Sequence, residues 1–198
     1  VYGISKKRQI AKQVINSFLT EKNTMKTGKL LGYPECCVRN HFYFVKHNMQ
    51  YQHPKVVYQS HKKSKKHSFL TNNLFNFTSR LKSKEDFRKQ KRYFSLNKNF
   101  SIPIYYLQFI SHIPCSYDCQ ESIKIGKRIQ RLLKEYAPNI EEVVTYTLSK
   151  PVLFFDLFKW VIFEGHVKEN ILFYKKVIPP ISLIDSLLLN KIKKGNKI

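Results

Sequence analysis

The segment that decides the fold class is residues 151–178, which read PVLFFDLFKWVIFEGHVKENILFYKKVI. It contains three short runs of apolar residues, many of them aromatic or β-branched, at 152–155, 159–163 and 171–177. Residues of these types are enriched in strands. We therefore predict a small antiparallel sheet near the C-terminus, with the last two strands joined by a turn that contains Gly165.

Most of the remaining sequence has the apolar periodicity of helices. Apolar residues spaced three and four apart predict helices over 5–21, 34–49, 116–136, 140–148 and 181–193. Ser116 is expected to cap the third of these helices. Residues 23–32 are expected to form a connector, and 93–113 a strand or buried extended chain. The predicted fold class is therefore α+β: a mostly helical single domain over residues 1–198 with a small antiparallel sheet.

The composition excludes some classes of protein. Hydrophobic residues make up 42% of the 198 residues, too many for a mainly disordered chain. The longest nearly apolar run, 151–163, is interrupted by Asp156 and Lys159 and is shorter than the roughly 20 residues of a membrane span, so no membrane partner is expected. Nothing resembling a signal peptide opens the sequence, which favours a cytoplasmic, reducing location with free or metal-bound thiols.

All four cysteines fall in two compact motifs, LGYPECCV at residues 31–38 and HIPCSYDCQES at residues 112–122. Each motif passes through a proline into the start of a predicted helix, where the helix dipole lowers the pKa of a thiol. Thiolates bind metals, and four of them suit a [4Fe–4S] cluster or a tetrahedral Zn²⁺ ion. We therefore expect one cofactor-binding or metal site, made by Cys36, Cys37, Cys115 and Cys119.

The spacing of the cysteines favours an iron–sulfur cluster, with Zn²⁺ as the alternative. Structural zinc sites commonly use Cys-x-x-Cys turns, and neither pair has that spacing. Adjacent residues on a helix, such as Cys36 and Cys37, point about 100° apart, which fits a bulky cluster better than a single ion. Two other interpretations stay open: a metal-free redox pair formed by Cys115 and Cys119, and unligated buried cysteines.

Two residues near the second motif are candidates for catalysis. His112 lies three residues before Cys115, within reach of the same site for proton transfer or metal binding, although a buried hydrogen-bonded histidine has the same pattern. Asp118 lies in the expected first turn of a helix, where a carboxylate also stabilises the dipole. His41, one helical turn after Cys37, is a possible further ligand. Ser122 and Gly126, four residues apart, are small enough to let another element approach closely.

The net charge of +23 is uneven, because residues 55–98 alone carry +11. Residues 55–92 lack sustained periodicity and are expected to form a basic, partly mobile insertion with a short helix over 85–91. Its lysines and arginines can neutralise the phosphates of RNA. Because the chain has 29 Lys against 7 Arg, a solvated basic surface typical of an AT-rich genome is the alternative. The candidate nucleic-acid contacts are Lys62, Lys63, Lys65, Lys66, Arg88, Lys89, Lys91 and Arg92.

On the two cysteine motifs, the chain resembles a family of uncharacterised archaeal and bacterial proteins, a domain-of-unknown-function family. Its motifs are LGYPxCCV and HxPCSxxCxxS, which match residues 31–38 and 112–122. The resemblance extends more loosely over about residues 30–178, and it implies that the four cysteines act together. It implies no activity.

The leading hypothesis is a cytoplasmic protein with a cysteine-ligated iron–sulfur cluster that acts on RNA, in tRNA modification or sulfur transfer. One alternative is a non-enzymatic nucleic-acid-binding module with a structural zinc site. The other is a metal-free thiol redox protein.

Overall fold

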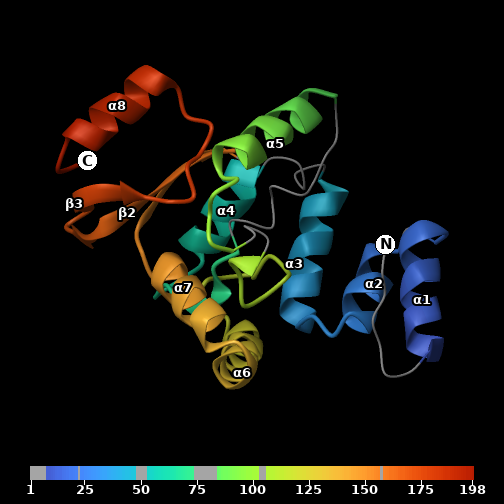
Figure 1. Ribbon diagram of the computed structural model, residues 1–198. Helices are drawn as coiled ribbons and strands as arrows, with labels where there is room; N and C mark the ends of the chain where they lie inside the picture. Colours follow the sequence, from blue (N-terminus) through green and yellow to red (C-terminus); the bar gives the residue numbers. More distant parts are fainter. Residues whose placement is uncertain (1–7, 22, 48–52, 74–83, 103–105, 157) are drawn as a thin grey trace.

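The computed structural model describes residues 8–21, 23–47, 53–73, 84–102, 106–156 and 158–198. In these ranges the N-terminal helices lie at one side of the molecule and a three-stranded antiparallel sheet lies at the other (Figure 1). The predicted α+β class, mostly helical with a small antiparallel sheet, is confirmed. None of the helices described is long and apolar enough to cross a membrane.

The N-terminal part consists of α1 (Arg8–Leu19), α2 (Thr24–Leu30) and α3 (Glu35–Lys46). The first and third of these helices were predicted, whereas the connector expected over residues 23–32 contains α2. This short helix forms because the Asn23 side chain accepts a hydrogen bond from the Lys26 N–H (2.9 Å) and caps it. It packs between its two neighbours.

Three further helical elements follow: α4 (His53–Lys62), the single 3₁₀ turn η1 (Phe69–Thr71) and α5 (Lys84–Leu96). The helix expected over 85–91 is longer than predicted, because Tyr93 continues the helical face and is fully buried against Trp160 (ring centroids 5.7 Å apart). α4 was not predicted. The described residues from 97 to 113 form irregular, mostly buried chain without a strand.

Two helices in the middle of the chain follow the cysteine motif. α6 (Gln120–Tyr136) begins four residues later than predicted, because its N-cap is Cys119 and not Ser116. α7 (Pro138–Leu148) packs against it and has its proline in the first turn, where the missing N–H costs nothing.

The sheet has the order β1 (Val152–Asp156), β2 (Lys159–Lys168) and β3 (Ile171–Ile178), all antiparallel. The turn between the last two strands is formed by Glu169 and Asn170, both with positive φ. The prediction that Gly165 lies in this turn is wrong. Gly165 lies within β2 beside a bulge, where a Cβ would collide with the Phe173 carbonyl.

Each face of β2 is buried in a different apolar cluster. Trp160 and Ile162 belong to the main core, whereas Val161 and Phe163 pack on the opposite face with Ile192 of the last helix, α8 (Ser186–Lys194). The main core also contains Val56, Leu70 and Tyr93, which come from residues 55–92 or follow them directly. The described parts of 55–92 are therefore packed into the core, while their status as an insertion stays a prediction.

Candidate metal centre

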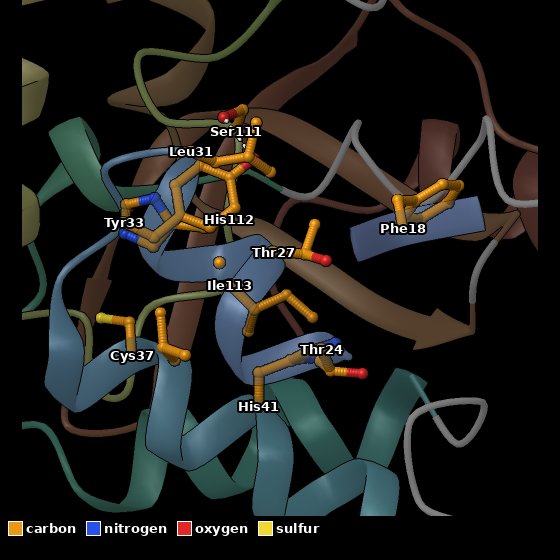
Figure 2. A pocket seen from close by; sticks show the side chains of 12 residues that line it. Phe18, Thr24, Thr27, Leu31, Tyr33, Cys37, His41, Ser111, His112 and Ile113 are labelled. Carbon is orange, nitrogen blue, oxygen red and sulfur yellow. Dashed lines mark hydrogen bonds between the residues drawn. The ribbon is translucent and has the colours of Figure 1, made fainter. Parts of the chain in front are cut away.

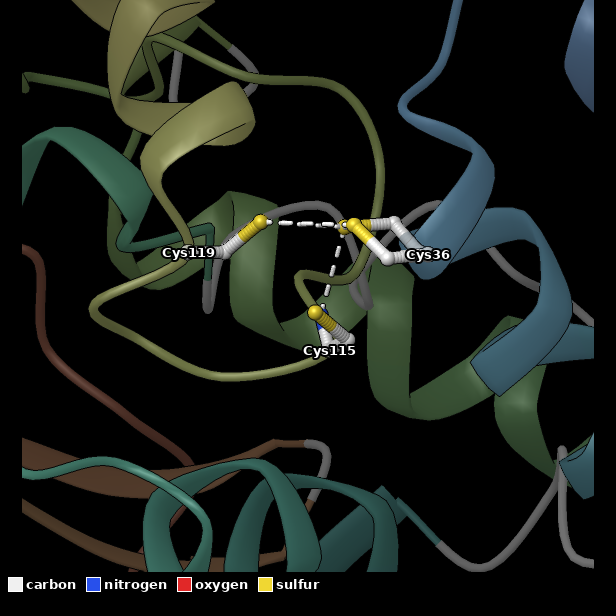
Figure 3. Close-up of side chains that lie close together, drawn as sticks. Cys36, Cys115 and Cys119 are labelled. Carbon is white, nitrogen blue, oxygen red and sulfur yellow. Dashed lines mark hydrogen bonds between the residues drawn. The ribbon is translucent and has the colours of Figure 1, made fainter.

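The two cysteine motifs meet between α3 and α6 (Figure 3). Cys36 and Cys37 lie in the first turn of α3, and Cys119 is the N-cap of α6, so these three cysteines have the helix-start positions expected from the sequence. Cys115 lies in the irregular chain just before α6. We call residues 112–119 the site loop and the four cysteines the cysteine cluster.

The four Sγ atoms of the cysteine cluster all lie within 4.8 Å of one another. Cys119 Sγ is 3.6 Å from Cys36 Sγ and 3.7 Å from Cys37 Sγ. The adjacent Cys36 and Cys37 have their Sγ atoms 3.9 Å apart, so their side chains converge and do not diverge as the helical angle suggested. The expectation that the four cysteines form one compact group, compatible with a metal site, is confirmed.

The cluster is closed on one side and open on the other. Cys37 and Cys119 are buried, Cys115 is half-buried and Cys36 is exposed. The Cys115 N–H donates a hydrogen bond to Cys37 Sγ (3.3 Å), which ties the site loop to α3. All four cysteines are free thiols in this structure, without a disulfide.

The pKa values of the cysteines in the cluster are shifted in different directions. Hydrogen bonds from Cys115 and Cys37 hold the pKa of Cys119 far below its ordinary value. A hydrogen bond with Cys115, the bond with Cys119 and burial all raise the pKa of Cys37, and the bond with Cys119 raises the pKa of Cys115 to about 11. Among the four cysteines, Cys119 is therefore the one that loses its proton most readily. A group of thiols that already stabilises one thiolate is suited to binding a cation.

His112 and Ser122 support the buried side of the cluster. His112 Nε2 lies 2.8 Å from Ser122 Oγ, and Ser122 Oγ lies 3.2 Å from Cys37 Sγ. His112 is buried, which lowers its pKa to about 4 and keeps the ring neutral. Ser122 therefore links His112 to a cysteine, a contact that the sequence did not predict for this serine.

Residues 60–73, which we call the support segment, hold the site loop through hydrogen bonds. Tyr117 takes part in three of them: its carbonyl accepts from Thr71 Oγ1 (2.7 Å) and from the Ser68 N–H (3.1 Å), and its N–H donates to Ser64 Oγ (2.7 Å). The loop backbone between the two cysteines is thus fixed by hydroxyl groups and backbone of a distant segment. A buried carbonyl without such donors would be costly.

Further bonds from the support segment reach the start of the site loop. Ser60 Oγ donates to the Pro114 carbonyl (2.8 Å), and Asn73 Nδ2 donates to the His112 carbonyl. Ser60, Thr71 and Asn73 are fully buried. The sequence predicted no role for these residues, because they are polar and do not belong to a periodic pattern of apolar residues. The signal in the sequence that could have indicated them is the recurrence of a serine every fourth residue, at Ser60, Ser64 and Ser68.

The lysines expected to bind nucleic acid between residues 62 and 66 lie beside the site loop. The Lys65 N–H donates to Asp118 Oδ2 (2.8 Å), and hydrogen bonds from Ser116 and from this backbone lower the pKa of Asp118. His67 stacks on Tyr117, with ring centroids 4.3 Å apart. The side chains of Lys62, Lys63, Lys65 and Lys66 are all exposed. The contacts of residues 65 and 67 thus join this basic strip, residues 61–67, to the site loop.

The other four predicted nucleic-acid contacts lie on a separate element. Arg88, Lys89, Lys91 and Arg92 are exposed on α5, and Lys89 forms an ion pair with Glu85 (2.6 Å). These four residues are neighbours because they lie on the same helix, and not because the cysteine cluster brings them together.

A cavity of about 380 Å³ lies against the cluster (Figure 2). Cys37 and His112 line it, together with His41, which the sequence placed on the same helical face as Cys37. Tyr33 lies beside His112 in the cavity wall, with ring centroids 4.9 Å apart. His41 is thus a lining residue of this cavity and does not belong to the four-sulfur group.

Comparison with known protein families places most of the chain in one family. The family described as "Protein of unknown function (DUF483)" matches residues 4–145, well over half of the chain. The expected resemblance to a domain-of-unknown-function family is confirmed, although the match begins and ends earlier than residues 30–178. It contains both cysteine motifs and the support segment, and it excludes the sheet. Searches of curated proteins and of solved structures found no significant match.

Proposed function

The chain belongs to the DUF483 family of proteins of unknown function, and we propose that it is a cytoplasmic, RNA-binding protein whose cysteine cluster holds one structural zinc ion. The zinc ion would join the start of α3 to the site loop, and the basic strip beside that loop would contact the RNA. Each half of this proposal has its own structural support and its own test.

The single observation that carries the zinc assignment is the set of sulfur–sulfur distances. The three separations of 3.6, 3.7 and 3.9 Å are nearly equal. A tetrahedral Zn²⁺ site with Zn–S bonds of about 2.3 Å has sulfur–sulfur edges of about 3.8 Å. Cys36, Cys37 and Cys119 therefore have the spacing that one tetrahedral ion requires, and Cys115 Sγ lies within 4.8 Å of all three.

The iron–sulfur cluster expected from the sequence is less well supported by this spacing. In a [4Fe–4S] cluster each cysteine binds a different iron atom, so the irons hold the cysteine sulfurs farther apart than a single ion does. Binding such a cluster would require the four side chains to separate. The site loop resists this movement because the support segment holds Tyr117 and Pro114.

We expect the chain, purified anaerobically without added metal, to contain about one zinc ion per molecule and no acid-labile sulfide. Elemental analysis and visible absorption measure this directly. Replacement of the zinc by Co²⁺ should give the absorption of a tetrahedral cobalt–thiolate site. Four irons with matching sulfide would contradict the zinc assignment and restore the cluster. A chain that takes up no metal at all would contradict both.

In this proposal His112 and Asp118 have supporting roles. Four cysteine ligands complete the coordination of a tetrahedral zinc ion and leave no open position for substrate. His112 then orients Ser122 against Cys37, and Asp118 accepts the hydrogen bond of the Lys65 N–H. The catalytic roles expected for these two residues from the sequence are therefore not needed for the proposed function.

The support for RNA binding is the position of the basic strip. Four exposed lysines occur within five residues, and Lys65 and His67 join this strip to a loop that carries two metal ligands. A metal-fastened loop keeps the backbone of the strip in one conformation, so that less entropy is lost when the strip binds phosphates. Neutralised phosphates release counterions, which makes such binding dependent on salt.

Replacing Lys65 and Lys66 together by alanine is expected to weaken the binding of unfractionated tRNA and to lower its salt dependence. The plot of log K, the logarithm of the binding constant, against log[salt] has a negative slope. This slope should become shallower by about 0.7 for each phosphate of a single-stranded region that the variant no longer neutralises. Fluorescence anisotropy at several salt concentrations measures the slope.

The matched control for this variant is Lys193→Ala with Lys194→Ala, which removes the same charge from exposed positions on α8. The control should keep the wild-type slope. An equal loss in the two double variants would show that only net charge matters and would overturn the role of the basic strip.

A further inference from the structure

The cavity beside the cysteine cluster has a closed floor and an open rim. Its floor is made by buried residues of three elements, among them Thr27 on α2, Cys37 on α3 and His112 in the site loop. At the rim, Phe18 is 53% exposed and Leu31 is 47% exposed. Large apolar side chains that surround the mouth of an apolar cavity are a feature of binding sites for small organic groups.

The close packing of α2 on α3 beside the cavity depends on a glycine. Gly28 contributes no side chain to the floor, and a Cβ at this position would lie 2.8 Å from Val38 Cγ2. α2 and α3 can therefore pack closely at Gly28 while the space between Leu31, Tyr33 and the site loop stays free.

The lining defines the chemistry of a ligand. No lysine, arginine, aspartate or glutamate is among the described residues that line the cavity, so its walls offer no permanently charged side chain to pair with a charged group. The rings of Tyr33 and His112 form one wall, where a flat ring can stack (Figure 2). Ser111 Oγ, which donates to the Tyr33 hydroxyl (3.1 Å), brings hydrogen-bonding groups to the same end of the cavity.

We propose that this cavity binds an uncharged heteroaromatic ring of nucleobase size, which stacks against the wall formed by Tyr33 and His112. Its volume of about 380 Å³ is at the small end of ligand sites, suited to a single base or nucleoside and not to a larger cofactor. The ring can come from a free nucleoside or from an unpaired base of RNA, since both present the same flat faces and hydrogen-bonding edges. The RNA source rests on the proposed function, whereas binding of the free ring does not.

The test is a titration of the full chain, as purified, with adenosine, guanosine, cytidine and uridine, followed by the backbone amide signals of Thr27, Gly28 and Ser111 in NMR spectra. Nucleosides carry no phosphate, so their binding is independent of the basic strip. We expect at least one nucleoside to shift these signals saturably. Tyr33→Leu, which removes the ring but keeps an apolar wall, should weaken that binding about tenfold or more.

The matched control is Tyr136→Leu, because Tyr136 is 76% exposed at the end of α6 and does not line the cavity. It should bind as the wild type does. If Tyr33→Leu fails to fold, Ser111→Trp provides a second variant, since Ser111 is exposed at the cavity and a large ring there would block entry. Folding of each variant is judged by its thermal transition.

A parallel titration with single-stranded RNA distinguishes the two sources of the ring, a free nucleoside and an unpaired base of RNA. Shifts of the same amides by both ligands identify a site that accepts free nucleosides, and shifts by RNA alone, abolished in Tyr33→Leu, identify a site for an unpaired base. The proposal is overturned if neither ligand shifts these amides, or if Tyr33→Leu binds like the wild type. Absence of salt-dependent tRNA binding, with nucleoside binding retained, would refute the proposed function and leave this inference intact.

Discussion

Replacing Cys37 by serine is expected to abolish stoichiometric zinc binding and to destabilise the chain by about 4 kcal/mol or more. Cys37 is the most enclosed of the four cysteines, with 2% of its surface exposed, and its Sγ contacts Cys36, Cys119, Ser122 and the Cys115 N–H. Serine is a poor zinc ligand, so three cysteines would remain to join α3 to the site loop. Metal content and the free energy of urea unfolding measure the effect.

Two comparisons make this prediction specific to the metal. Cys36→Ser should cost less than Cys37→Ser, because Cys36 is exposed and a water molecule can replace its sulfur. Removal of the metal from the wild type with a chelator should lower its stability to the level of Cys37→Ser. A Cys37→Ser variant that still binds one zinc ion, or a wild type that a chelator leaves unchanged, would contradict the proposed metal centre.

Replacing Gly126 by leucine is expected to destabilise the chain by about 3 kcal/mol, although leucine is the better helix former. Gly126 is buried on α6 against η1, and a Cβ there would lie 2.7 Å from the Leu70 carbonyl oxygen. Because the obstacle is backbone, η1 must move away, and the hydrogen bond from Thr71 to the Tyr117 carbonyl would then break. We expect weaker zinc binding together with the lower stability.

Lys127→Leu serves as the control, since Lys127 is the next residue of the same helix and is exposed. Its effect should stay within about 0.5 kcal/mol. Gly126→Ala should fall between the two. If Gly126→Leu were as stable as the control, the close approach of η1 to α6 would not be important for the site.

The close approach at Ser122 and Gly126 was predictable, because small residues one helical turn apart are a local property of the sequence. The start of α3 just after Pro34 was predictable for the same reason, since a proline in or just before the first turn is a local signal. The start of α7 was placed two residues too late, at residue 140, because Pro138 was expected to lie outside the helix. The start of α6 was placed too early, because both Ser116 and Cys119 can occupy a capping position. The tertiary contacts of Tyr117 keep residues 115–118 out of the helix.

The relative position of the Cys36 and Cys37 sulfurs is the point on which sequence spacing and structure differ most. The preference for a bulky cluster depended on the helical angle between Cys36 and Cys37. Side-chain torsions are free to compensate for that angle, and the two Sγ atoms converge to 3.9 Å. A distance between side-chain atoms is set by rotamers that packing selects, so residue spacing alone does not determine it.

Residues 60–73 were the least predictable part of the site. Their hydroxyl and amide side chains bond to backbone groups of the site loop, at Pro114, Tyr117 and His112. A backbone carbonyl is the same at every position, so the partners of these side chains leave no complementary pattern in the sequence. The lysines around them dominate the composition and indicated a solvated segment.

The sequence by itself determined the α+β class, the two cysteine motifs with their helix starts, and the concentration of positive charge in residues 55–98. These features depend on local periodicity, local capping and composition, which a single chain displays directly. Only the tertiary structure decided that four sulfurs converge to within 4.8 Å of one another and that the basic strip joins the loop that carries two of them. Both depend on contacts between residues more than 50 positions apart, such as Lys65 with Asp118, and on the packing that fixes their side chains. The charge and the cysteines, separate in the sequence, are neighbours in the fold.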